Sequence, residues 1–190
     1  MDRFTSTALM AAALVFTASS SQAAVTVIGS GLSHTCYEAA EYATNTTEGI
    51  AACTEALEEA ALPTRDRAAT YINRGILYSV SGDAETAIKD YNQGLALEPK
   101  LGEGYVDRGA AFIVLKQYDD AIENIDKGIA LNANRLHIAY YDRAIANEAL
   151  GNIRAAYEDC KKAVELQPNF TLAVERLSRF KVIRRPGTGT

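Results

Sequence analysis

The pentapeptide Tyr71-Ile72-Asn73-Arg74-Gly75 recurs as Tyr105-Val106-Asp107-Arg108-Gly109 and as Tyr140-Tyr141-Asp142-Arg143-Ala144. The copies begin 34 and then 35 residues apart (105 − 71 and 140 − 105). A second set of landmarks, Ala87, Ala121 and Ala156, has the same spacing. A fixed period in this range predicts stacked units of two helices each, and such stacks commonly bind other proteins.

The side-chain period within a unit predicts a packed pair of helices. Tyr71, Gly75 and Tyr78 share one face of a first helix at spacings i, i+4 and i+7. Ala87 and Gly94 lie on one face of the helix that follows. Small residues on both faces let two helix backbones approach closely, so we expect each unit to be an antiparallel pair.

This pattern resembles that of the tetratricopeptide repeat (TPR) family. The resemblance covers three full repeats, residues 68–101, 102–135 and 136–169, and Pro99 and Pro168 close two of them. It implies an all-α fold, a right-handed α-solenoid of antiparallel helix pairs.

Two flanking segments are expected to extend the solenoid. Residues 33–62 are interpreted as a helical hairpin and degenerate repeat, because Gly49–Cys53 runs like Ala87–Tyr91. Residues 170–185 are similar to the solvating cap helix of such arrays, with a basic tail. The apolar face of that helix would seal the third repeat with Phe170, Ala173, Val174 and Leu177.

The N-terminus has the pattern of an export signal. Arg3 precedes the short apolar stretch Ala8–Ala18, and Ser21-Gln22-Ala23 is typical of a cleavage site. Residues 1–23 are therefore predicted to be a signal peptide that is not part of the fold, cleaved after Ala23 or Ala24. We expect an exported protein that is soluble after cleavage and located in a bacterial periplasm, with secretion as the alternative, and residues 24–32 as a linker that has little to pack.

Export changes the interpretation of the cysteines, because an oxidising compartment permits disulfides. Cys36 and Cys53 are equidistant from the predicted turn near Asn45. Opposite positions in an antiparallel helix pair face each other, which favours a structural disulfide that stabilises the hairpin by roughly 3 kcal/mol. A redox-active pair is the alternative, but the Cys-x-x-Cys spacing is absent. Cys160 aligns with core positions of the other repeats and is expected to be a buried thiol.

Function is expected on the first helices of the repeats, which in the family line a concave groove that holds a polypeptide segment. The resemblance places the candidate groove residues opposite the core tyrosines, and acidic side chains among them favour a partner with apolar and basic residues. The alternative is that these residues pack on neighbouring helices or are solvated. The candidates are Ile72, Asn73, Ile76, Val106, Asp107, Ala110, Ile113, Tyr141, Asp142 and Ile145, with Glu103 and Glu148 beside them.

One family subtype is not matched. Chaperone-tail co-chaperones hold an acidic C-terminus with a clamp of asparagines and basic residues. Asn73 matches that clamp, but Asp107 and Asp142 stand where it needs an asparagine and a base, and Ala69 and Ile138 replace its lysines. An acidic C-terminal peptide is therefore an unexpected ligand.

The repeated Arg74, Arg108 and Arg143 allow two interpretations. One is a basic stripe for a ligand. The favoured one is an inter-repeat ladder, in which each arginine bridges to an Asp or Asn of the preceding repeat. The candidate acceptors recur on the second helices as Asp90, Asn124 and Asp159.

Charge and motif content argue against other functions. The net charge of −5 disfavours a nucleic acid partner. We find no catalytic motif, no clustered metal ligands and no phosphate loop, and expect a non-enzymatic protein without cofactor. An acidic N-terminal hairpin and a basic C-terminal helix suggest an alternative function, a structural protein that stacks head to tail, although solvated helix faces also explain this charge pattern.

Overall fold

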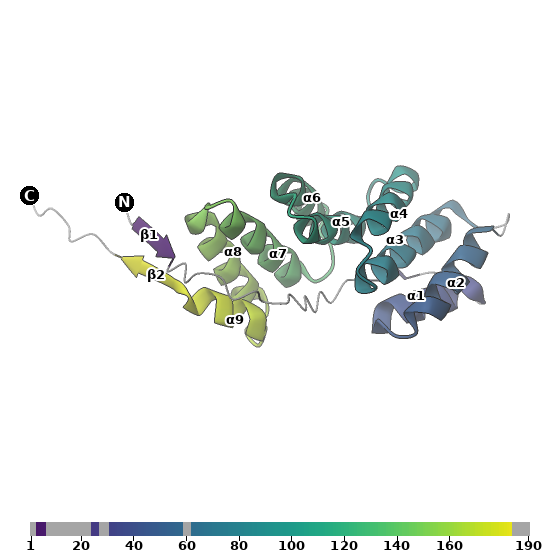
Figure 1. Ribbon diagram of the computed structural model, residues 1–190, viewed down its shortest axis with the longest axis horizontal. Coiled ribbons are helices and arrows are strands. Elements are labelled where there is room, and N and C mark those ends of the chain that lie inside the picture. Colours follow the sequence, from purple (N-terminus) through teal and green to yellow (C-terminus); the bar gives the residue numbers. More distant parts are fainter. Residues whose placement is uncertain (1–2, 7–23, 27–30, 59–61, 184–190) are drawn as a thin grey trace, which may run out of the picture.

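The computed structural model describes residues 3–6, 24–26, 31–58 and 62–183. In this part of the chain, four antiparallel helix pairs stack side by side in chain order, and a single helix follows them (Figure 1). The expectation of an all-α solenoid of antiparallel pairs is confirmed. The helices are α1 (Leu32–Tyr42), α2 (Thr46–Glu58), α3 (Thr64–Val80), α4 (Ala84–Leu97), α5 (Gly102–Val114), α6 (Tyr118–Ala130), α7 (Leu136–Ala149), α8 (Ile153–Leu166) and α9 (Thr171–Ser178).

Small residues set the close approach of the helices within each pair. A Cβ added to Gly75 on α3 would lie 2.6 Å from the ring of Tyr91 on α4. At the same position of the next pair, a Cβ on Gly109 would lie 2.6 Å from Cγ1 of Ile125. In the third pair Ala144 takes this position, and the residue aligned with Tyr91 and Ile125 is the smaller Cys160. Cys160 is fully buried, as expected, and burial raises the pKa of its thiol to about 12.

The repeated arginines join the helices of one pair and also reach the preceding pair. Arg74 donates from Nε and Nη2 to both carboxylate oxygens of Asp90, at 2.7 and 2.8 Å, and from Nη1 to Oγ1 of Thr54 at 3.1 Å. Arg143 repeats this fork on Asp159, at 3.0 and 2.6 Å, while its Nη1 donates to Asp126 of the preceding repeat. The inter-repeat contact is thus present.

The prediction of which residues accept the inter-repeat hydrogen bonds was wrong. Asp90, Asn124 and Asp159 lie in the same repeat as the arginine they bind. The residues of the preceding unit that accept instead are Thr54, Asn92 and Asp126. The reason is geometric, because Nε of each arginine, together with Nη2 in Arg74 and Arg143, faces the partner helix within the pair, while Nη1 points to the preceding unit.

The middle arginine has neutral partners. Arg108 donates to Oδ1 of Asn124 at 2.7 Å and to Oδ1 of Asn92 at 2.5 Å. Burial lowers the pKa of Arg108, whereas hydrogen bonds to Asp90 and Asp159 raise the pKa of Arg74 and of Arg143. Arg143 is therefore held by two carboxylates and Arg108 by none.

The C-terminal segment differs from expectation. The expected cap helix over residues 170–185 ends at Ser178, and strand β2 (Phe180–Ile183) follows. Phe180 is buried with its ring edge-on to Tyr157 at 6.0 Å, which favours leaving the helix at this point. Beyond it, β2 pairs antiparallel with β1 (Arg3–Ser6). This strand falls inside residues 1–23, which we expected to take no part in the fold, while residues 7–23 lie outside the described part.

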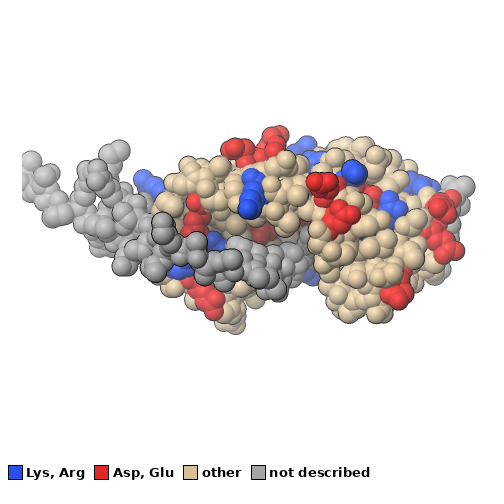
Figure 2. Space-filling model, in the orientation of Figure 1, with Lys and Arg blue, Asp and Glu red and all other residues tan. Residues whose placement is uncertain are grey.

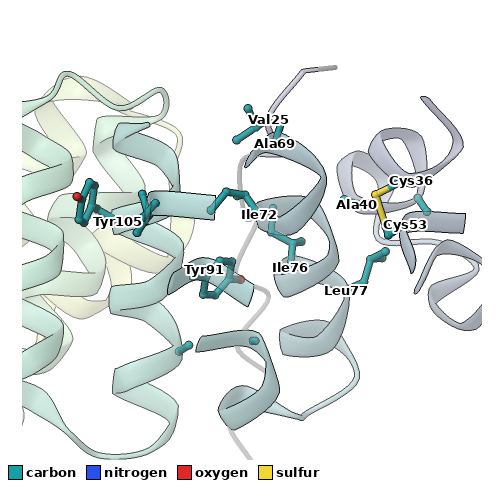
Figure 3. Close-up of a cluster of buried hydrophobic side chains, with 14 of the residues drawn as sticks. Val25, Cys36, Ala40, Cys53, Ala69, Ile72, Ile76, Leu77, Tyr91 and Tyr105 are labelled. Atoms are coloured by element: carbon teal, nitrogen blue, oxygen red, sulfur yellow. A yellow bond between two sulfur atoms is a disulfide. The ribbon is translucent and has the colours of Figure 1, made fainter. Parts of the chain in front are cut away.

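The N-terminal hairpin contains the disulfide between Cys36 on α1 and Cys53 on α2, with Cα atoms 4.8 Å apart (Figure 3). Both cysteines are fully buried in a cluster that continues through Ile76 and Leu77 of α3. The disulfide therefore belongs to the same apolar core as the first repeat.

Replacing both cysteines, as in Cys36→Ala/Cys53→Ala, is expected to lower the free energy of unfolding of the hairpin by about 3 kcal/mol, because the variant loses the loop constraint. Urea unfolding followed by circular dichroism measures this, with Cys160→Ala as the control for losing a buried sulfur outside the hairpin. Equal losses in the two variants would contradict a stabilising disulfide.

Arg143→Ala is expected to cost about 3 kcal/mol of stability and Arg108→Ala about 1 kcal/mol, since only the first leaves a buried carboxylate, Asp159, without its cation. Thermal and urea unfolding of the two variants, compared with the exposed-site control Arg154→Ala, give the ranking. A larger loss of stability for Arg108→Ala than for Arg143→Ala would show that pairing with carboxylates does not set the strength of these arginine contacts.

Candidate functional site

The row of first helices, α1, α3, α5 and α7, forms the inside of a curved array. Glu41 at the end of α1 accepts a hydrogen bond from Nη2 of Arg135, which precedes α7, at 3.1 Å. The helices α3 and α5 lie between these residues in the order of packing. A direct contact across them requires the array to bend toward the side that carries Glu41 and Arg135. We call this side the first-helix face.

A segment from the N-terminal end of the chain lies on this face. Val25 donates its backbone N–H to Oδ1 of Asn73 at 2.8 Å, and its C=O accepts from Nδ2 of the same side chain at 2.9 Å. Val25 is 8% exposed and packs in the core cluster that includes Ala69 and Ile72 of α3 (Figure 3). A residue whose N–H and C=O both bond to one partner group is hydrogen-bonded like a residue in a strand pair.

This contact corrects the expectation that residues 24–32 are a linker with little to pack. Val25 and Asn73 are 48 residues apart, so no local period relates them. The run of β-branched residues from Val25 to Ile28 is the one sequence feature that pointed to an extended segment here. Residues 27–30 lie outside the described part.

Three of the candidate groove residues are core residues. Ile72 is fully buried, and its Cδ1 would lie 2.8 Å from a Cβ on Gly94 and 2.7 Å from one on Gly104. Ile76 is 1% exposed within the same cluster, and Val106 is 7% exposed. These side chains are core residues rather than an accessible groove floor, because Ile72 and Val106 pack against Gly94 and Gly128 on the second helix of their own pair, and Ile72 also packs against Gly104 of the next pair. The alternative reading, packing on neighbouring helices, holds for them.

Four other candidates remain half-buried and accessible in part. They come from two neighbouring first helices, α5 and α7, which contact each other. Only the aromatic one is engaged by the cap, since Tyr141 has the ring of Phe170 edge-on at 5.2 Å and the guanidinium of Arg176 5.2 Å from its centroid. The four are Ala110, Ile113, Tyr141 and Ile145.

The acidic candidates are not available in the way expected. Asp107 and Asp142 are buried, at 3% and 8% exposure. Glu103 accepts from the backbone N–H of Asn134 at 3.1 Å. Glu148 pairs with Arg176 at 2.5 Å and Arg179 at 3.2 Å, both from the C-terminal end of the chain. The expected preference for a basic partner therefore loses its structural basis.

Asp142 has the most perturbed carboxyl of this face. Burial raises the pKa of Asp142 to about 7, and the nearby Arg176 on α9 opposes this rise. Asp142 follows Tyr141 on α7, the residue that Phe170 and Arg176 cover. A carboxyl with this pKa changes charge in the neutral range and makes the α7–α9 contact sensitive to pH.

The visible surface carries mixed charge. In Figure 2, acidic and basic side chains are interspersed over the coloured part of the face shown, without a continuous basic patch. Among the described residues, no group of three or more potential metal ligands occurs. No helix in this part of the chain has the length and apolar content needed to cross a membrane.

Comparison with known proteins agrees with the helix pairs. The sequence model of the tetratricopeptide repeat family matches residues 68–101 and 137–170. These stretches coincide with the first and third of the repeats described above. The comparisons support the TPR family. No curated protein matches the chain.

Solved TPR structures share the architecture. The first TPR domain of the human RPAP3 protein aligns at 27% identity with a TM-score of 0.58, covering 60% of this chain and 90% of that one. The first TPR of Spaghetti (RPAP3), bound to the HSP90 peptide SRMEEVD, aligns at 28% identity with a TM-score of 0.56, covering 59% and 88%. A crystal structure of MamA covers 77% of this chain and 79% of its own at 21% identity, with a TM-score of 0.63, which shows a common fold alone.

The variant Asp142→Asn is expected to be more stable than the wild type at pH 8 and equally stable at pH 4. The folded state holds the Asp142 proton up to about pH 7, while the unfolded state releases it near the usual value of 3.8. Wild-type stability therefore falls as the pH rises through this window, by up to about 1.4 kcal/mol per unit from this group, and an amide avoids the loss.

Urea unfolding of both proteins at pH 4, 6 and 8 measures the difference. Asp120→Asn, at an exposed position, is the control for removing a carboxylate. A difference between Asp142→Asn and the wild type that stays constant with pH would contradict the raised pKa.

Proposed function

We propose that this protein is a non-enzymatic binding module that holds an extended polypeptide segment on its first-helix face. The observation that carries the proposal is the pairing of Asn73 with both backbone groups of Val25. It supports a face that accepts a chain in strand-like conformation by its backbone. The TPR fold adds support, since relatives of this fold bind peptides.

The chemistry of the face favours an apolar segment. Beyond Asn73, its partly accessible side chains are Ala110, Ile113 and Ile145, with Tyr141 at the end next to α9. The carboxylates near them are buried or paired, so they contribute little attraction for a basic partner. We propose a partner segment that has small aliphatic side chains and is uncharged where it contacts these residues.

An acidic tail is a poor candidate. The Spaghetti (RPAP3) domain and the second TPR domain of human RPAP3 were solved with the peptides SRMEEVD and SGPTIEEVD. In this chain Asp107 and Asp142 occupy positions where such a clamp needs an amide and a base. Neither residue supplies the amide or the cation that a ligand ending in carboxylates requires.

We propose that the protein works in an exported compartment, a bacterial periplasm. The leader-like pattern of residues 1–23 and the disulfide between Cys36 and Cys53 support this location. Head-to-tail stacking is the weaker alternative, because Arg176 and Arg179 of the basic C-terminal region already pair with Glu148.

Affinity capture from an envelope extract tests the binding proposal. Wild type is expected to retain a polypeptide that the variant Ala110→Glu/Ile145→Glu loses, because two charges on the first-helix face disfavour an apolar segment. Ala96→Glu/Ala155→Glu, at exposed positions of the second helices, is the matched control for added charge. Circular dichroism confirms that all three proteins fold.

A polypeptide retained equally by all three proteins would move the binding surface away from the first-helix face. Dissociation of the purified protein into smaller species at rising salt, with no captured partner, would favour the stacking alternative.

A further inference from the structure

The site at Asn73 is already filled by the chain itself. The structure gives Val25 two backbone hydrogen bonds to Asn73 and buries its side chain beside Ala69 and Ile72. Backbone bonds of this kind do not depend on the sequence of the segment, while the buried side chain selects for size and for absence of charge. Any external segment that uses this site meets a competitor.

Among the three aligned repeats, the first carries an amide side chain at this position. Asn73 aligns with Asp107 and Asp142 in the next two repeats, at the same place in the pentapeptide. An amide side chain donates and accepts at once, whereas an ionised carboxylate only accepts. One residue of a bound segment can thus present both its N–H and its C=O to Asn73, but not to an ionised aspartate at the equivalent position.

Residues 24–26, which occupy the site at Asn73, are tethered close to it by the chain. Thr26, which is exposed, is separated from the start of α1 at Leu32 only by residues 27–31. The hairpin that α1 forms packs directly on α3, the helix that carries Asn73. A short tether of this kind holds a segment at an effective concentration in the millimolar range. A free ligand must be present at a higher concentration than this, or bind the site more tightly than the segment does.

We propose that residues 24–26 are an intramolecular occupant of the peptide site at Asn73, and that a partner binds this site by displacing them. The inference rests on the proposed function, because it assumes that the first-helix face takes an external segment. It adds the identity of the built-in competitor and the ligand chemistry: a backbone free to pair with an amide, and a valine-sized side chain.

The binding of residues 24–26 at Asn73 is tested first, by amide hydrogen exchange of the full chain followed by NMR. The Val25 amide is expected to be protected in the wild type and to lose at least tenfold of its protection in Asn73→Ala. Asp107→Ala, at the aligned position one repeat later, is the control and should leave the Val25 amide protected. An unprotected Val25 amide in the wild type would overturn the proposal, while leaving capture by the rest of the face unaffected.

Competition is tested with a labelled peptide that has the sequence of residues 24–32. Val25→Asp expels the tethered segment, so this variant is expected to bind the probe about tenfold more tightly than the wild type, by fluorescence anisotropy. Thr26→Asp adds the same charge at an exposed position and should bind like the wild type. Val25→Asp/Asn73→Ala should lose the gain.

Equal affinity of Val25→Asp and wild type for the probe, or no binding to either, would overturn displacement at this site. A wild-type dimer that Val25→Asp converts to a monomer would place the segment in a neighbouring copy and overturn the intramolecular assignment. If the probe behaves as expected but extracts yield no captured polypeptide, the built-in competitor stands and the proposed external binding fails.

Discussion

The close approach of two helix backbones at Gly75, Gly109 and Ala144 is the constraint on which the rest of the array depends. It is possible only because these residues are small: a Cβ on Gly75 or Gly109 would lie 2.6 Å from the side chain of Tyr91 or Ile125, and Ala144 lies in one core cluster with the smaller Cys160. The approach fixes how far each helix slides along its partner. As a result, the arginine that precedes each small residue bonds 16 residues onward in all three repeats, to Asp90, Asn124 and Asp159.

The same arginines turn separate pairs into a stack. Nε of each arginine bonds within the pair, and Nη1 reaches the preceding unit, at Thr54, Asn92 or Asp126. Such a bond adds little to stability alone, but the three bonds lie at successive joints, where stacking also buries apolar side chains such as Ile72 between α4 and α5. At the C-terminal end, Glu148 with Arg176 and Arg179 takes over this role and holds α9 on α7.

Periodicity predicts what every repeat shares, which explains where sequence reasoning succeeded here. The helix pairs, the buried Cys160 and the Cys36–Cys53 contact all follow from positions within one unit. It fails where the period does not tell which helices a side chain packs against: Ile72 was assigned to a groove, but it packs against Gly94 of its own pair and against Gly104 of the next pair. Contacts between distant parts, such as Val25 with Asn73 or Glu41 with Arg135, have no period at all.

The first-helix face is therefore not uniform along the array, although its repeats are alike. Toward α9, Tyr141 is covered by Phe170 and Arg176, and Asp142 beside it changes charge near neutral pH. Toward the hairpin, the amide of Asn73 pairs with both backbone groups of Val25. On the proposed function, a segment bound along the face is positioned by its backbone at the first repeat and selected by apolar contacts at Ala110 and Ile145. Because Val25 fills the backbone site, it lowers the apparent affinity of every external ligand for that site by the same factor, so a partner must bind tightly enough to displace a tethered valine.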